Sequence, residues 1–120
     1  MSKGRYSVRD CQAVDWTPLC ERVRGAPVVF AVDVAKEAFV AAVMRDNGEL
    51  LERIKWRHPA QTRLVLDALV ALRGCAELAV VMESSGSYGD ALRWQLHERG
   101  IAVYPPAVRI DVASPWGDFV

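Results

Sequence analysis

Two acidic residues each follow an apolar run in this chain. Asp33 comes directly after the run at residues 28–32, and Glu83 comes directly after the run at residues 78–82. If both runs are parallel strands, their carboxyl ends meet at one edge of a sheet, where open α/β sheets bind ligands. Two converging carboxylates suit Mg²⁺, a hard cation that binds carboxylate and phosphate oxygens. Pairs of such ions promote phosphodiester cleavage, so the pattern indicates that class of chemistry.

A purely structural interpretation of these two acids stays open. Acidic residues also end buried strands because the chain meets water there, and a two-metal site usually draws on more than two carboxylates. Asp111 and Asp118 lie beyond the last clear strand. Pro115 and Gly117 would break any helix that joined them, so neither aspartate is counted as a member of the site.

Four basic residues are candidate nucleic-acid contacts. Lys36 lies three residues after Asp33, and Arg53, Lys55 and Arg57 alternate with other residues along an apparent strand. Cations spaced along a strand can follow a phosphate backbone. A solvated sheet edge explains the same alternation, because charge on an edge strand discourages mispairing.

The hydrophobic periodicity predicts the elements that position these residues. Strands are expected at residues 28–33, 39–44, 49–57, 78–82 and 101–104. Helices are expected from Pro59 to a stop at Gly74, and from Tyr88 to about Arg99. This βββαβαβ order predicts an α/β protein with a mixed five-stranded sheet in the order 3-2-1-4-5 and helices packed on it. That arrangement is typical of a ribonuclease H-like fold.

Two local features refine this prediction. Asn47-Gly48 between the second and third strands predicts a tight hairpin in which both residues take positive φ. Trp56 and Trp94 lie within amphipathic elements, so both are expected to be packing residues.

Composition favours one small globular domain that does not bind DNA strongly by itself. The chain has 120 residues, 52% of them hydrophobic, and its 15 basic and 15 acidic side chains balance to a net charge of zero. This composition excludes a disordered chain, and free-standing nucleic-acid binders usually carry a basic excess. We expect a leader at residues 1–26, a domain at 27–104 and a divergent tail at 105–120.

The cysteines and the apolar runs predict a cytoplasmic protein without a membrane segment. Cys11, Cys20 and Cys75 are odd in number and form no C-x-x-C pair, so the expectation is three reduced thiols. No apolar run approaches the roughly 20 residues of a membrane helix. The basic start has no apolar segment behind it, so it does not resemble a signal peptide.

Two segments carry a family resemblance. Residues 28–36 read VVFAVDVAK and residues 81–88 read VMESSGSY. The chain resembles, over about residues 28–104, the N-terminal domain of DEDD-type insertion-sequence transposases, the insertion sequence 110 family related to the Piv invertases. That family typically shows an "IDVAK" strand end and an "ME(A/S)(T/S)G(S/V)Y" turn at about this separation.

The resemblance implies a RuvC-like, ribonuclease H-like nuclease domain with a Mg²⁺-dependent acidic tetrad. Asp33 would be the first aspartate of that tetrad and Glu83 its glutamate. Members of the family mobilise DNA by strand cleavage and recombination, are guided by a structured RNA and work as oligomers of transposase subunits. DNA, a guide RNA and further transposase subunits are therefore the implied partners.

The chain also departs from the family pattern. The last two aspartates of the tetrad have no counterpart, and the residues after Tyr104 no longer match the family pattern. The family's second domain, which carries its catalytic serine, has no counterpart either. We therefore expect a truncated transposase domain that is inactive as this fragment alone. A sheet built to support a further helix would leave an apolar face uncovered near its first and fourth strands and would be marginally stable.

Two other functions remain open. A non-catalytic binding module could act on a full-length transposase or on its guide RNA. An actin-like or sugar-kinase-type phosphotransferase is a weaker alternative. Such enzymes carry a glycine-rich turn after the first aspartate, whereas Val34-Ala35-Lys36 follows Asp33 here.

Overall fold

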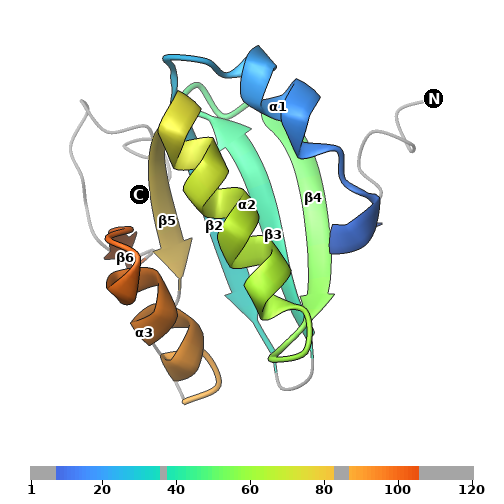
Figure 1. Ribbon diagram of the computed structural model, residues 1–120, viewed down its shortest axis with the longest axis vertical. Coiled ribbons are helices and arrows are strands. Elements are labelled where there is room, and N and C mark those ends of the chain that lie inside the picture. The colour runs from blue at the N-terminus through green and yellow to red at the C-terminus, as the bar shows by residue number, and fades with distance from the viewer. Residues whose placement is uncertain (1–7, 36–37, 83–86, 106–120) are drawn as a thin grey trace.

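A mixed sheet of six strands forms the centre of the described part of the chain (Figure 1). The computed structural model describes residues 8–35, 38–82 and 87–105. The strands are β1 (Arg9–Asp10), β2 (Pro27–Val34), β3 (Ala38–Arg45), β4 (Leu50–Arg57), β5 (Glu77–Met82) and β6 (Val103–Tyr104). The helices are the 3₁₀ helix η2 (Cys11–Ala13), α1 (Trp16–Arg22), α2 (Thr62–Cys75) and α3 (Asp90–Glu98). The α/β class and the mixed sheet are as predicted.

The predicted count of five strands is wrong, because the sheet has the order β1-β4-β3-β2-β5-β6. The added strand, β1, runs parallel to β4 and places Arg9 opposite Ile54. Two residues are too few to show a hydrophobic period, which is why this strand escaped prediction. The strand expected at the edge, β4, therefore has a neighbour on both sides over Ile54 and Lys55.

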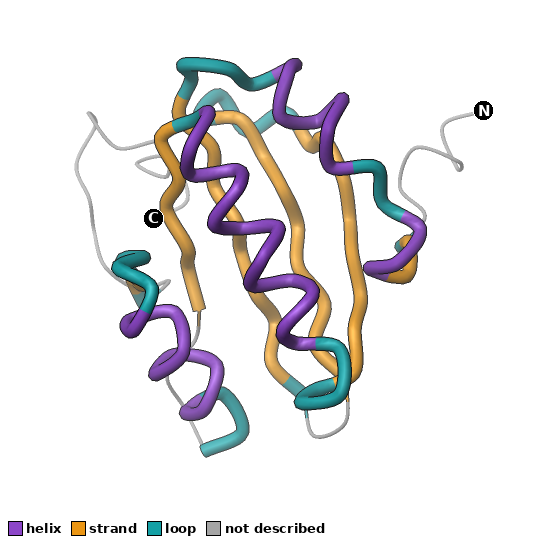
Figure 2. Tube along the Cα trace, viewed as in Figure 1, coloured by secondary structure: helices purple, strands orange, loops and turns teal. Residues whose placement is uncertain are grey.

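The main core lies between the sheet and α2, which crosses one face of the sheet (Figure 2). Strand alternation sends Phe30 of β2, Phe39 of β3 and Trp56 of β4 to this face, where their rings pack together. The apolar stripe of α2 covers them with four buried side chains, Val65, Leu66, Leu69 and Leu72. Burial of this kind of side chain is the main favourable term in folding.

The boundaries of α2 differ slightly from the prediction. Residues 59–61 form a turn in which the Thr62 amide donates to the Pro59 carbonyl at 3.2 Å, and the helix begins only at Thr62. At the other end α2 continues through Gly74 to Cys75. The Cys75 carbonyl accepts a hydrogen bond from the Gly25 amide at 2.7 Å. This contact satisfies one of the carbonyls that a helix end leaves free.

The hairpin between β3 and β4 is not the predicted two-residue type. Only Gly48 takes a positive φ there, 90°, and no described residue other than glycine has a positive φ. The Gly48 amide donates to the Arg45 carbonyl at 3.0 Å, and the Asn47 side-chain oxygen accepts from the Glu49 amide at 2.9 Å. This local bond to Asn47 favours a longer loop that ends in a left-handed glycine.

The two tryptophans differ in burial. Trp56 is 1% exposed, as predicted for a packing residue, whereas Trp94 is 61% exposed. In α3 the buried positions are Leu92 and Leu96, spaced four residues apart. Trp94 lies between them, on the other side of the helix.

Residues 8–24 pack on the core although the sequence suggested a leader. Leu19 and Val23 are buried in the same cluster as the side chains of the sheet, and so are Cys11 and Val14. The backbone carbonyl of Arg22 accepts a hydrogen bond from the Arg45 guanidinium at 3.1 Å. The position of the domain boundary stays a prediction.

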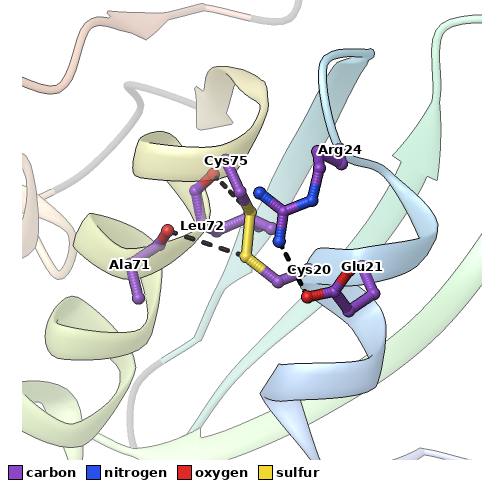
Figure 3. Close-up of polar contacts among 6 residues, drawn as sticks. All are labelled: Cys20, Glu21, Arg24, Ala71, Leu72 and Cys75. Atoms are coloured by element: carbon purple, nitrogen blue, oxygen red, sulfur yellow. Dashed lines mark hydrogen bonds and ion pairs between the residues drawn. A yellow bond between two sulfur atoms is a disulfide. The ribbon is translucent and has the colours of Figure 1, made fainter.

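A disulfide between Cys20 and Cys75 replaces the expected reduced thiols (Figure 3). It joins α1 to the last residue of α2, with Cα atoms 6.2 Å apart and a sequence separation of 55 residues. Cys11 is a buried free thiol. No spacing rule could pair these two cysteines, because α1 and α2 meet only through tertiary packing. None of the helices in the described ranges has the length and apolar character needed to cross a bilayer.

Candidate nucleic-acid interface

Asp33 lies on the face of the sheet opposite α2, which we call the second face. Its neighbour Val32 is 7% exposed and belongs to the core, and Val34 packs against that core as well. Because side chains alternate along a strand, Asp33 lies on the other side and is exposed to solvent.

The register between β2 and β5 aligns the residues that precede the two predicted carboxylates. The two strands run parallel, and Val32 of β2 lies opposite Met82, the last residue of β5. In the sequence Val32 is followed by Asp33 and Met82 by Glu83. Glu83 itself lies outside the described residues, as does Lys36. The distance between the two carboxylates therefore stays a prediction.

Cross-strand rows bring the basic residues of β4 onto the same face as Asp33. Asp33 lies opposite Val40 of β3, and Val40 lies opposite Lys55 of β4, so the three residues form one row. The next row joins Ala31, Ala42 and Arg53 in the same manner. Residues in one row share a face. The expected basic stripe of β4 thus lies on the second face with the first motif acid.

Lys55 and Arg57 are exposed and line a cleft of about 480 Å³ at the end of β4. The Arg57 amide donates to the side-chain oxygen of Gln61 at 2.8 Å, which ties the strand end to the turn before α2. Asp10 of β1 contributes an acidic group to the same cleft. Arg53, the third basic residue, is half-buried. The cleft therefore combines two exposed cations with one carboxylate.

The rest of the second face is mainly apolar. Half-buried side chains from β2, β3 and β5 occupy it, namely Ala31, Val40, Ala42, Met44, Ala79 and Val81. The described helices lie on the opposite side, since Leu19 of α1, Leu66 of α2 and Leu92 of α3 all belong to the core cluster (Figure 1). The apolar face expected near the strands now labelled β2 and β5 is thus left without a helix by the described residues.

The pKa values of one histidine and of one cysteine thiol are shifted. Burial lowers the pKa of His58, whose ring stacks on Phe39 with centroids 4.7 Å apart. Its Nδ1 lies 2.7 Å from the Thr62 hydroxyl oxygen, which accepts a hydrogen bond from the Trp56 indole at 3.2 Å. Burial, and then the charge of Asp10, raise the pKa of the Cys11 thiol. Both shifts favour the neutral form.

The described residues do not by themselves make a Mg²⁺ site. They contain no group of three or more His, Cys, Asp or Glu side chains arranged to hold a metal. Of the two expected ligands they include one, Asp33. Mg²⁺ requires near-octahedral oxygen coordination, and a single carboxylate supplies too few of these ligands.

A second cleft, which the sequence did not suggest, lies between α3 and β6. It has a volume of about 540 Å³, and Arg93, Trp94 and His97 line its helical side. The rings of Trp94 and His97 lie 5.8 Å apart. The sequence signal that could have indicated this cleft is the position of Trp94 outside the apolar stripe formed by Leu92 and Leu96.

No protein-family model, curated protein or solved structure matches this chain. The family resemblance therefore rests on the two sequence motifs.

Proposed function

We propose that this chain is a ribonuclease H-like domain of a DNA transposition protein and that it contacts DNA through the second face of its sheet. The observation that carries the proposal is the row formed by Asp33, Val40 and Lys55. It puts the acid of the first transposase-like motif and the basic stripe of β4 on one surface. Neither the motif alone nor the stripe alone would connect an acidic site with phosphate-binding cations.

The charges suggest how the surface meets DNA. Lys55 and Arg57 are exposed and can neutralise phosphates, which releases counterions and favours binding. Asp33 repels phosphate when no cation is bound. A divalent cation held by Asp33, with Glu83 as its proposed second ligand, would reverse that repulsion. DNA binding by this domain is therefore expected to increase with Mg²⁺.

Strand cleavage is not expected from this chain by itself. The two motifs supply two carboxylates, and two-metal phosphodiester cleavage needs both metals held in place. We propose that other transposase subunits, in a homo-oligomer guided by a structured RNA, supply the remaining groups. With a net charge of zero, the domain needs such partners to hold DNA firmly.

The test compares DNA binding by two matched variants. Fluorescence anisotropy with labelled linear and branched duplexes is measured in Mg²⁺ and in EDTA. Asp33→Asn should bind more tightly than the parent chain in EDTA, because a repulsive charge is gone, and should lose the gain that Mg²⁺ produces. Asp67→Asn is the control, since Asp67 is exposed on α2, away from the second face. Identical behaviour of the two variants would contradict the proposal.

The same assay separates the alternatives. A binding module for guide RNA or for full-length transposase is the second candidate, because the two motifs supply only two carboxylates, Asp33 and Glu83. It would bind structured RNA or co-purify with transposase, with no response to Mg²⁺ that depends on Asp33. Hydrolysis of ATP by the purified chain would favour the phosphotransferase instead.

A further inference from the structure

Residues 8–24, which we call the N-terminal arm, lie against α2 and β4. The arm contributes β1 to the edge of the sheet beside β4, and Arg9 forms an ion pair with Glu52 at 3.3 Å. Leu19 and Val23 fill the core at its far end. The arm therefore completes the sheet edge beside the cleft that Lys55 and Arg57 line, which we call the basic cleft.

The elements of the arm are too short to hold this position through their own backbone hydrogen bonds. Strand β1 has two residues, and α1 has seven. An isolated helix of this length is unstable in water, because nucleation is unfavourable. Packing of a few side chains and the covalent bond from Cys20 to Cys75 supply the rest. The position of the arm thus depends on a few packed side chains and on one covalent bond.

The sulfur atoms of this bond have an environment that also suits two thiols (Figure 3). The Cys75 sulfur lies 3.3 Å from the Leu72 carbonyl oxygen, and the Cys20 sulfur lies 3.7 Å from the Ala71 carbonyl oxygen. After reduction each thiol can donate a hydrogen bond to the carbonyl beside it. Both cysteines are half-buried rather than sealed in the core. Reduction therefore leaves no buried group unpaired.

We propose that the Cys20–Cys75 disulfide is a reversible redox tether that controls the position of the N-terminal arm. The thiolate of a cellular dithiol attacks one sulfur of the disulfide and forms a mixed disulfide. The second thiol of the reductant then attacks the reductant's sulfur in the mixed disulfide and releases the protein sulfur as a thiol. Cys20 and Cys75 each gain one electron and one proton, and the dithiol becomes a disulfide. The reduced arm then opens far more often.

Opening of the arm changes the basic cleft. Asp10 belongs to the arm and lines the cleft with Lys55 and Arg57. When β1 leaves β4, this carboxylate leaves too, and the outer edge of β4 is freed. The cleft then becomes more positive. For this consequence alone the inference rests on the proposed function, and it predicts tighter DNA binding by the reduced chain.

The tether is tested by hydrogen exchange followed by mass spectrometry, without DNA. After treatment with oxidised glutathione, a peptide pair joined through Cys20 and Cys75 should be found. Adding a dithiol should then speed exchange in the arm on the order of tenfold or more, while amides of β3 keep their protection. The Cys20→Ala/Cys75→Ala chain should exchange like the reduced parent chain and should not respond to the dithiol.

Two results would overturn the tether. One is equal protection of the arm in the oxidised and the reduced parent chain. The other is recovery of Cys20 and Cys75 as free thiols after oxidation. If the double variant unfolds, amides of α2 and β3 will lose protection, and the two redox forms of the parent chain still decide the question. A failure of DNA binding leaves this readout unaffected, so the two proposals can fail separately.

Discussion

At the scale of single residues, a short polar chain links the core to the cleft region. Trp56 donates to the Thr62 hydroxyl oxygen, and Nδ1 of His58 lies 2.7 Å from the same oxygen. The Thr62 hydroxyl hydrogen can then be donated to Nδ1 of a neutral His58. Stacking on Phe39 shields one side of the ring from water. This environment disfavours the charged form of the histidine.

The lowered pKa of His58 makes stability depend on pH. Below its ordinary value of 6.5, the unfolded chain binds the proton more readily than the folded chain. Stability from this residue is therefore fully present above pH 6.5 and falls as the pH drops through the window between the two pKa values. We expect urea unfolding midpoints to decrease on acidification just below pH 6.5. His58→Gln should show a smaller decrease there, and an unchanged pH profile would contradict the assignment.

At the scale of elements, the glycine of the β3–β4 loop and the glycine of α2 differ in backbone conformation. Gly48 has a φ of 90°, and Gly74 lies in the last turn of α2. A Cβ atom at either position would meet nothing within 4 Å. Backbone conformation, rather than space, therefore decides what an added methyl group does.

Alanine at these two positions should shift stability in opposite directions. Gly48→Ala forces a left-handed alanine and should destabilise the protein by about 1 kcal/mol. Gly74→Ala should stabilise it by roughly 0.5 to 1 kcal/mol, since glycine is a poor helix former. Chemical unfolding at equilibrium measures both. Destabilisation of similar size in both variants would show that the two backbone conformations are not those described.

At the scale of the whole molecule, a net charge of zero does not exclude a local group of cations. Lys55 and Arg57 concentrate positive charge at one end of β4, on the face opposite the main core. Phosphate binding can therefore be local and strongly dependent on salt.

Salt dependence of DNA binding tests whether these two cations contact phosphates. Each phosphate contact adds roughly 0.9 to the slope of log affinity against log salt. Lys55→Ala and Arg57→Ala should each weaken binding to all DNA sequences and reduce the slope by about 1. Arg63→Ala is the control, because Arg63 is exposed on α2, on the opposite face. An equal change in all three variants would mean that the contacts are not at the second face.

Local patterns in the sequence accounted for much of this fold. The apolar runs ending at Val32 and Met82 are parallel neighbours, as predicted, because buried strands are marked by their own residues. The basic alternation along β4 was also visible in the sequence. The conformation of Asn47 was predicted wrongly, because its side-chain bond to the Glu49 amide competes with the two-residue turn.

The sequence by itself determined the α/β class, the run of strands and helices, and the candidate residues Asp33, Lys55 and Arg57. Tertiary structure alone decided that these three share one surface, that β1 joins the sheet, and that Cys20 bonds to Cys75. The physical reason is the distance along the sequence over which each kind of interaction acts. Periodicity reflects the burial of neighbouring residues on one element, whereas these contacts form between elements that only packing brings together.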